Sequence, residues 1–291
     1  MDSMLPPAKK FLDALQTESP LQIAGTINAY SAILAKQAGF KAIYLSGAGV
    51  ANASYGLPDL GITNLNNVLE DVRRITSAVD LPLLVDIDTG FGSILNVSNS
   101  VKEICKAGAC GVHLEDQVNS KRCGHRDGKQ LISTDEMCEK IQAAKLSIKD
   151  NLLDHDFIIM ARTDAVANEG LDLAIARALH YIAAGANMIF AEAITSIKDY
   201  ELFTSQVKVP VLANITEFGK TPLYSLDELK QAGIKMVLYP LSAFRAMNKA
   251  AFDVYEAIRK DGTQKDVVTI METREELYNN LDYFSFENKL K

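Results

Sequence analysis

Tryptophan is absent from this chain of 291 residues, and cysteine and histidine occur only four times each. The cysteines, at positions 105, 110, 123 and 138, are too few for a disulfide framework to stabilise a chain of this length. No apolar run approaches the roughly 18 consecutive residues of a membrane-spanning helix. The first residues, MDSMLPPAKKFLDAL, lack the apolar region of a secretory signal. We therefore expect a cytoplasmic protein with reduced thiols and no membrane contact.

Positive charge is in deficit. Lys and Arg together number 30 against 37 for Asp and Glu, which gives a net charge of −7. An acidic chain is a poor electrostatic partner for nucleic acid, so we expect none. Apolar residues at 48% and charged residues at 23% are ordinary for a globular protein, and they exclude disorder as the main state.

Several common catalytic motifs are missing. The sequence contains no GxSxG and no phosphate loop of the P-loop type, which disfavours serine hydrolases and P-loop nucleotide enzymes. His125 and His155 do not form a zinc-like cluster. His113 and His180 lie on apolar runs, where we expect them to be core residues.

One short pattern recurs four times. A helical stretch ends in Ala-Gly and an apolar run follows, as in KQAGFKAIYL, KAGACGVHL, AAGANMIFA and QAGIKMVLY. Glycine just past a helix end adopts the left-handed conformation at low cost and turns the chain into the next strand. Four further apolar runs, QIAGTINAY, LPLLVDID, DFIIMARTD and VPVLANIT, bring the predicted strands to eight.

The segments between these runs carry apolar residues at helical spacing. Eightfold alternation of strand and helix predicts an α/β fold, a TIM-type (β/α)₈ barrel in a single domain over residues 1–291, with an extra N-terminal helix. The alternative is a doubly wound open sheet, disfavoured because no GxGxxG follows the first strand. Beyond the barrel, Ser242–Lys260 and Val267–Leu281 are predicted helices of a C-terminal extension, 242–291, that packs on the barrel or on a neighbouring subunit.

Polar residues end seven of the eight predicted strands. In a barrel the carboxyl ends of all strands converge on one face, which carries the chemistry. Contact with water explains one or two polar strand ends but explains the whole set poorly. The residues are Asn28, Ser46, Asp86 with Asp88, Glu115 with Asp116, Arg162 with Asp164, Glu192, and Asn214 with Thr216.

The strongest pair in this set is Asp86 and Asp88. Alternate strand residues share a face, so both carboxylates can point the same way, and they repel unless a cation or a proton intervenes. Oxygen ligands with positions left for water suit Mg²⁺. Glu115 and Asp116 on the next strand could complete the shell directly or through water. The alternative is a pair of solvated loop aspartates.

A thiol stands among basic residues in the stretch KRCGHR, residues 121–126. Nearby cations lower the pKa of a thiol and also hold an anionic substrate, although a basic loop is often merely solvated. The other cysteines lie in apolar patterns and are interpreted as small core residues. Arginine binds carboxylates through two hydrogen bonds, which makes Arg162, at a strand end, a candidate for substrate binding. For Arg245 and Arg274, spacing alone does not choose between substrate binding and a structural ion pair.

Several motifs in order resemble the isocitrate lyase and phosphoenolpyruvate mutase superfamily. They are LVDIDTGFG at 84–92, GVHLEDQ at 111–117, KRCGH at 121–125, MARTDA at 160–165, AEA at 191–193 and LANITEFG at 212–219. SGAGVANASYGLPDLG and YPLSAFRAMN strengthen the match, which runs from about Leu21 to Lys289. Within the superfamily, the chain most resembles the branch that acts on 2-methylisocitrate.

This resemblance implies a Mg²⁺-dependent carbon–carbon lyase that cleaves 2-methylisocitrate to succinate and pyruvate, in propionate catabolism through the methylcitrate cycle. It implies that Asp86 and Asp88 hold the metal with Glu115 in its outer shell, and that Cys123 protonates the succinate carbanion. The base is left open between Tyr44, Asp59 and a metal-bound water. Substrate binding is assigned to Ser46, Gly47, Ala48, Gly124, His125, Arg162, Glu192, Asn214, Thr216, Arg245 and Arg274. The family also implies a homotetramer whose C-terminal helices are exchanged between subunits.

Three other functions compete with this interpretation. They are a related enzyme such as an oxaloacetate decarboxylase or a phosphonopyruvate enzyme, a non-catalytic binding subunit on an inactive barrel, and cleavage of isocitrate as the main activity. The cysteine of KRCGH disfavours the first, and the intact acidic set disfavours the second. Residues 119–130 are predicted to form a lid that closes over the substrate and excludes water.

Overall fold

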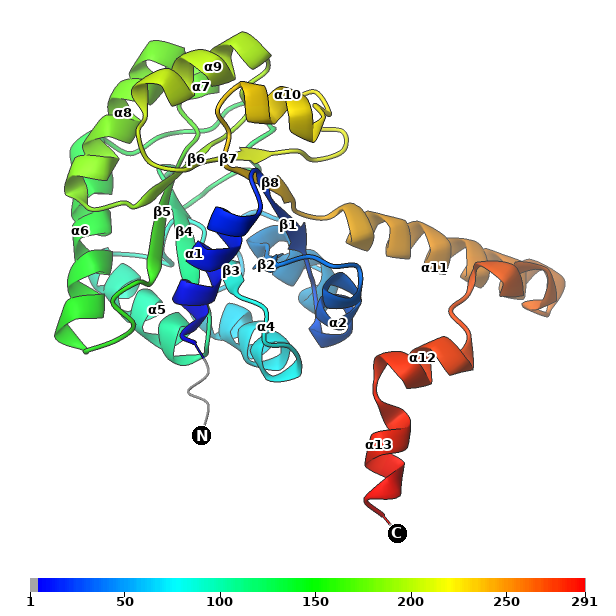
Figure 1. The fold of residues 1–291 in the computed structure, drawn as a ribbon. Coiled ribbons are helices and arrows are strands. Elements are labelled where there is room, and N and C mark those ends of the chain that lie inside the picture. The colour runs from blue at the N-terminus through cyan, green and yellow to red at the C-terminus, as the bar shows by residue number, and fades with distance from the viewer. Residues whose placement is uncertain (1–4, 291) are drawn as a thin grey trace. The chain divides into compact units, whose positions relative to one another are not determined.

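The structure is a computed structural model that describes residues 5–290, and within them eight parallel strands close into a barrel in sequence order (Figure 1). This confirms the predicted (β/α)₈ barrel and shows that the open-sheet alternative is wrong. The strands are β1 (Leu21–Gly25), β2 (Ala42–Leu45), β3 (Leu83–Asp86), β4 (Gly111–Glu115), β5 (Ile158–Thr163), β6 (Met188–Ala191), β7 (Val211–Asn214) and β8 (Met236–Tyr239).

Helices surround the barrel on its outer side (Figure 1). They are α2 (Ala29–Gln37), α4 (Leu65–Ala78), α5 (Ile94–Lys106), α6 (Thr134–Asp150), α7 (Val166–Glu169), α8 (Leu171–Ala184), α9 (Ile197–Gln206) and α10 (Leu226–Gln231). The short α3 (Gly47–Gly49) and a π-helical turn at Val50–Ser54 follow β2. Ala178 and Tyr181 of α8 are buried, whereas His180 is exposed between them and contacts the Ala176 carbonyl oxygen at 2.8 Å through Nδ1. The prediction of a core residue at His180 is wrong, because helical spacing turns that position outward.

The helix before the barrel, α1 (Pro7–Thr17), closes the amino-terminal end of the barrel. Phe11 and Ala14 are buried in one cluster with interior side chains such as Leu21, Ile158 and Met236 near the starts of strands. The other main cluster lies between the strands and the surrounding helices. The strands are therefore buried on both faces, as their continuous apolar runs predicted.

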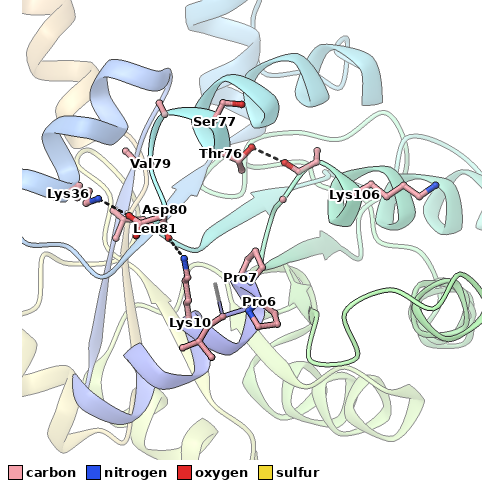
Figure 2. A pocket seen from close by; sticks show the side chains of 14 residues that line it. Pro6, Pro7, Lys10, Lys36, Thr76, Ser77, Val79, Asp80, Leu81 and Lys106 are labelled. Carbon is pink, nitrogen blue, oxygen red and sulfur yellow. Dashed lines mark hydrogen bonds and ion pairs between the residues drawn. The ribbon is translucent and has the colours of Figure 1, made fainter. Parts of the chain in front are cut away.

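A recess of 710 Å³ lies at this amino-terminal end, between the start of α1 and the ends of α4 and α5 (Figure 2). The Lys10 ammonium donates to the Asp80 carbonyl oxygen at 3.1 Å, and the Lys36 ammonium lies 2.7 Å from the Asp80 carboxylate. These lysines join α1 and α2 to the loop before β3. We therefore interpret the recess as a structural feature that stabilises the fold, which is the usual role of this face of a barrel.

Strand pairing sets the register of the opposite, carboxyl-terminal face. Asp86 of β3 lies beside His113 of β4, and Glu115 of β4 lies beside Arg162 of β5. Neighbouring strands in parallel register present their side chains to the same face. The polar strand ends are therefore brought together by backbone pairing alone.

The chain divides into two compact units at the bond between Leu241 and Ser242. The second unit contains α11 (Ser242–Asp261), a 3₁₀ turn (Lys265–Ile270), α12 (Arg274–Asn280) and α13 (Tyr283–Asn288). The predicted continuous helix over Val267–Leu281 is wrong. Thr273 accepts from the Glu276 amide, and the Glu276 carboxylate accepts from the Thr273 amide, so this capping box starts a new helix.

No helix among residues 5–290 has both the length and the apolar character needed to cross a membrane.

Candidate active site

Asp86 is fixed at the end of β3 by three donors. Its Oδ2 accepts from the Gly47 amide at 3.0 Å and from the Tyr44 hydroxyl at 3.2 Å, and its Oδ1 accepts from the Asp88 amide at 2.9 Å. Burial opposes ionisation of Asp86, but neighbouring His113, Lys121 and Arg162 outweigh burial and lower its pKa to about 2. Asp86 is therefore an oriented, ionised carboxylate.

Asp88 has a different environment two residues later. Its backbone is left-handed, with φ of 49°, and its Oδ1 lies 2.5 Å from the Lys121 ammonium. Burial and the charge of Asp86 together outweigh Lys121 and raise the Asp88 pKa to about 6. Two buried, adjacent carboxylates repel each other unless a cation or a proton intervenes, so this pair favours positive charge between them.

Lys121 supplies part of that charge and links two loops, because it contacts both Asp88 and Asp59. Its ammonium also lies 2.7 Å from Asp59 Oδ1, and its side chain is 5% exposed. From the sequence, Lys121 is one cation of a basic loop, and its position between Asp59 and Asp88 is not evident. The available signal was its place two residues before Cys123 within the KRCGH motif.

Glu115 completes the acidic group from β4. Its Oε2 lies 3.4 Å from Arg162 Nε, and its Oε1 has no hydrogen-bond partner among residues 5–290. Burial raises the Glu115 pKa well above its usual value. An orphaned buried carboxylate oxygen requires a further partner, and a divalent cation fits this set of oxygen donors.

Because Gly47 has no side chain, space is left beside the carboxylates of Asp86 and Asp88 that any other residue would fill. A Cβ at this position would lie 2.8 Å from Asp88 Oδ1 and 3.2 Å from Asp86 Oδ2. Asp116 does not belong to the set, because it accepts from the Thr163 and Tyr181 hydroxyls at 2.8 Å each. The suggestion that Asp116 completes the metal shell is wrong, since consecutive strand residues point to opposite faces.

Tyr44 and His113 lie beneath Asp86, inside the barrel. The Tyr44 hydroxyl is 2.8 Å from His113 Nε2, and the two rings are stacked with centroids 5.6 Å apart. Because the hydroxyl donates to Asp86, we assign the His113 proton to Nε2, which donates to Tyr44. Burial lowers the His113 pKa to about 4. His113 is buried as predicted, but it supports the site rather than only filling the core.

Arg162 of β5 is the central cation of the other half of the site. Its Nε and Nη2 donate to the two oxygens of Asp164 at 2.9 and 3.2 Å, and Nη2 lies 3.3 Å from Glu192 Oε2. The guanidinium also stands over the Phe190 ring, 5.1 Å from its centroid. Such an arrangement holds a guanidinium in one orientation for a carboxylate.

His125 and Asn214 join this group through Glu192. The Lys220 amide donates to His125 Nδ1 at 3.0 Å, so we assign the proton of neutral His125 to Nε2, which lies 3.2 Å from Glu192 Oε1. The Asn214 amide nitrogen donates to Glu192 Oε2 at 3.3 Å. The group therefore contains both donors and acceptors, as recognition of carboxylate and hydroxyl groups requires.

Cys123 is exposed beside a cavity of 690 Å³ that Asp59 and His125 also line. Although the residue is exposed, nearby protein atoms desolvate the thiol and raise its pKa, with further contributions from Asp59 and Glu192. The predicted lowering of this pKa is wrong. The reason is that Lys121 is held by carboxylates, and the Arg122 guanidinium donates to the Asp127 carbonyl oxygen instead.

Contacts connect most of the predicted site residues. Tyr44 and Gly47 contact Asp86, with Ser46 and Ala48 on either side of Gly47 in sequence. Asp59 and Asp88 share Lys121. Arg162 contacts Glu115 and joins it to a group that contains Gly124, His125, Glu192 and Asn214, and Thr216 lies near His125 around Gly219. Arg245 and Arg274 belong to the second unit, and their role in substrate binding stays a prediction.

Comparison with known proteins gives consistent matches. The sequence pattern of the phosphoenolpyruvate phosphomutase family matches residues 11–259. The 2-methylisocitrate lyase of Escherichia coli (strain K12) is 57% identical over 289 residues, 99% of this chain and 96% of the relative. The crystal structure of 2,3-dimethylmalate lyase, a PEP mutase/isocitrate lyase superfamily member, has a TM-score of 0.90 at 30% identity, covering 98% of this chain and 94% of that one. Phosphonopyruvate hydrolase in complex with oxalate and Mg²⁺ has a TM-score of 0.84 at 29% identity, covering 98% of each chain.

Proposed function

The chain belongs to the phosphoenolpyruvate phosphomutase family, and from this premise we propose that it is a carbon–carbon lyase that cleaves 2-methylisocitrate to succinate and pyruvate. The family resemblance inferred from the motifs is thereby confirmed. Identity of 57% with a 2-methylisocitrate lyase along nearly the whole chain supports the substrate. The observation that carries the proposal is one continuous set of contacts: Cys123 and Asp59 line the same cavity, and Lys121 joins Asp59 to Asp88.

The proposed cofactor is Mg²⁺, held by Asp86 and Asp88 with Glu115 nearby. When bound there, a divalent ion supplies charge stabilisation to oxygens that become negative during cleavage. The orphaned Glu115 oxygen and the space beside Gly47 support this assignment. The complex of phosphonopyruvate hydrolase with oxalate and Mg²⁺ is a related case in a structure of 29% identity.

Arg162 and its neighbours are proposed to bind the succinate-forming part of the substrate. Arg162 is oriented by Asp164 and Glu192, so its guanidinium can hold a carboxylate without first being ordered. His125 and Asn214 provide further polar groups around Glu192. Ser46, Gly47, Ala48, Gly124 and Thr216 are proposed to line the remaining part of the pocket.

Cleavage requires one proton to leave the tertiary hydroxyl and another to reach the new carbanion. Cys123 is proposed as the donor, because its raised pKa keeps the thiol protonated at neutral pH. For the base, Asp59 is better placed than Tyr44. Asp59 lines the Cys123 cavity, whereas the Tyr44 hydroxyl lies inside the barrel and donates to Asp86.

The deciding experiment measures product release from two substrates. Purified protein with Mg²⁺ is supplied with 2-methylisocitrate or isocitrate, and pyruvate and glyoxylate are assayed separately. We expect pyruvate from 2-methylisocitrate as the main activity, abolished by a chelator. Some glyoxylate is expected from isocitrate, because a single methyl group is worth only about 1–3 kcal/mol of discrimination. Faster release of glyoxylate than of pyruvate would make isocitrate the substrate, and full activity in chelator would exclude the metal.

A further inference from the structure

Lys129 is a buried lysine inside an otherwise exposed loop. Its side chain is 1% exposed, whereas its neighbours Asp127, Gly128 and Gln130 are exposed. Gly128 has a φ of 78°, a left-handed conformation that turns the chain between them. An ammonium is costly to bury without partners, so the contacts that Lys129 makes indicate what it is there to hold.

Those contacts reach two parts of the site. The Lys129 ammonium donates to the Gly124 carbonyl oxygen at 2.5 Å and to Asp164 Oδ1 at 3.0 Å. Gly124 stands between Cys123 and His125, and Asp164 orients Arg162. One side chain therefore joins the backbone that carries the thiol to the carboxylate that holds the substrate-binding guanidinium.

The backbone at Gly124 is also closely packed on the side that faces Arg162 and Glu192. A Cβ on Gly124 would lie 2.3 Å from Arg162 Nη2 and 2.7 Å from Glu192 Cγ. The loop backbone thus packs directly on the arginine, and Lys129 holds it there from the opposite end of the 124–129 turn. The Asn168 side chain adds an anchor, since its amide donates to the Lys129 carbonyl oxygen at 2.8 Å.

We propose that Lys129 is a positioning residue for the lyase reaction. Its ammonium seats residues 123–125 against Arg162 through the Gly124 carbonyl oxygen and Asp164, and so fixes the Cys123 thiol over the cavity. Lys129 does not touch the substrate. The inference rests on the proposed function for its kinetic consequence, but the seating of the loop can be measured without any substrate.

The test is the rate at which iodoacetamide alkylates Cys123 in the Lys129→Met variant, followed by mass of the labelled peptide. Loss of a nearby cation can only raise the thiol pKa and slow the reaction. We expect the opposite, an increase of about tenfold, because a released loop moves the thiol away from the protein atoms that now crowd and desolvate it. Cys138 in α6 is half-buried and serves as an internal reference whose rate should not change.

Two control variants separate this role from a general effect. Lys208→Met removes another ammonium that donates to a backbone carbonyl, that of Ser205, on an exposed segment before β7. Gln130→Ala removes an exposed side chain next to Lys129 in the same loop. In both variants Cys123 should be alkylated at the wild-type rate.

A separate kinetic experiment tests the consequence for catalysis. Lys129→Met should lower kcat for 2-methylisocitrate at least tenfold and change KM less than about threefold, because a small displacement of a reacting group is costly.

Alkylation of Lys129→Met at or below the wild-type rate overturns the proposal, and so does an equal increase in Gln130→Ala. If Lys129→Met does not fold, the uncharged Asn168→Ala variant decides the question by the same criterion, with an expected increase of about two- to threefold. Failure of the wild-type protein to cleave 2-methylisocitrate would refute the proposed function but would leave the alkylation result unaffected.

Discussion

The Cys123 thiol is held protonated by its surroundings in spite of its basic sequence context. Desolvation, Asp59 and Glu192 all raise its pKa. A protonated thiol suits a proton donor, because the group must carry its proton when the carbanion forms. The basic residues of the motif instead neutralise carboxylates or bind the loop backbone.

Replacement of Cys123 by serine tests this role. Turnover should fall by about 10²- to 10⁴-fold, the usual contribution of a positioned proton donor, while KM changes little. Steady-state kinetics of pyruvate release measure both constants. A variant that cleaves 2-methylisocitrate at the wild-type rate would remove Cys123 from the mechanism.

The hydroxyl of Tyr44 is predicted to act through the metal site. Tyr44→Phe removes a donor from Asp86 Oδ2 and leaves the Gly47 and Asp88 amides in place. Loss of such a supporting hydrogen bond typically weakens metal affinity by about 10- to 100-fold. Titration calorimetry with Mg²⁺ measures the change directly.

Tyr181→Phe is the matched control, since it removes another buried hydroxyl that donates to an aspartate, Asp116, away from the metal site. Its Mg²⁺ affinity should equal that of the wild type. Equal weakening in both variants would mean that Mg²⁺ affinity reports only general damage to the barrel.

At the scale of elements, Asp116 joins β4, β5 and α8. It accepts from the Thr163 hydroxyl, the Asp164 amide and the Tyr181 hydroxyl. Arg177 adds a hydrogen bond to the Tyr181 hydroxyl at 3.1 Å. This buried network supports the backbone of the strand end that carries Arg162 and Asp164.

Tyr181→Phe should therefore lower the free energy of unfolding by about 1.5–3 kcal/mol, the range for a hydrogen bond to a charged group. The shift of the urea midpoint at constant slope measures this loss. A midpoint that does not move would show that solvent or other donors replace the hydroxyl.

The loop of residues 119–130 is predicted to become protected when ligands bind. Its ends are joined by a bridge between Gln117 and Leu131, and its interior is tied to the barrel by Lys121 and Lys129. Limited proteolysis with and without succinate plus Mg²⁺ tests the lid. Cleavage in this window should slow when both are present, and equal cleavage would argue against closure.

The elements were largely predictable from sequence, because each depends on local patterns. Apolar runs located the strands, and their polar ends located the active face once a barrel was inferred. The position of Lys121 was not predictable, because it depends on Asp59 and Asp88, which are distant in sequence. The predicted direction of the Cys123 pKa shift was wrong for the same reason. The charged residues next to Cys123 in sequence are not the charged groups closest to its thiol in space.

At the scale of the whole molecule, the second unit exposes a long helix. None of the residues of α11 is buried, and Phe252 and Tyr255 are 58% and 70% exposed. An amphipathic helix normally buries its apolar side. We therefore propose that this unit packs between copies of the chain. The homotetramer with exchanged C-terminal helices is what the family resemblance implies, and it would cover this exposed helix.

Light scattering coupled to size-exclusion chromatography should give four times the chain mass of 31.8 kDa. Replacing Phe252 and Tyr255 by aspartate should shift the protein towards smaller species, because charge on a buried contact surface is costly. Exposed Lys249→Ala on the same helix is the control. A wild-type protein of monomer mass would contradict the proposed assembly.

Gly47 and Gly124 differ in kind from the glycines that end helices. At Gly39 and Gly170 the backbone has φ of 92° and 88° with open space around the Cβ position, whereas at Gly47 and Gly124 the nearest obstacles are Asp88 and Arg162. Saturation mutagenesis should therefore yield two kinds of intolerance: thermolability with activity retained at the first pair, and a well-folded but inactive product at the second. A glycine whose alanine variant is well expressed and folded but inactive would thus be identified as part of the active-site lining, without any bound ligand.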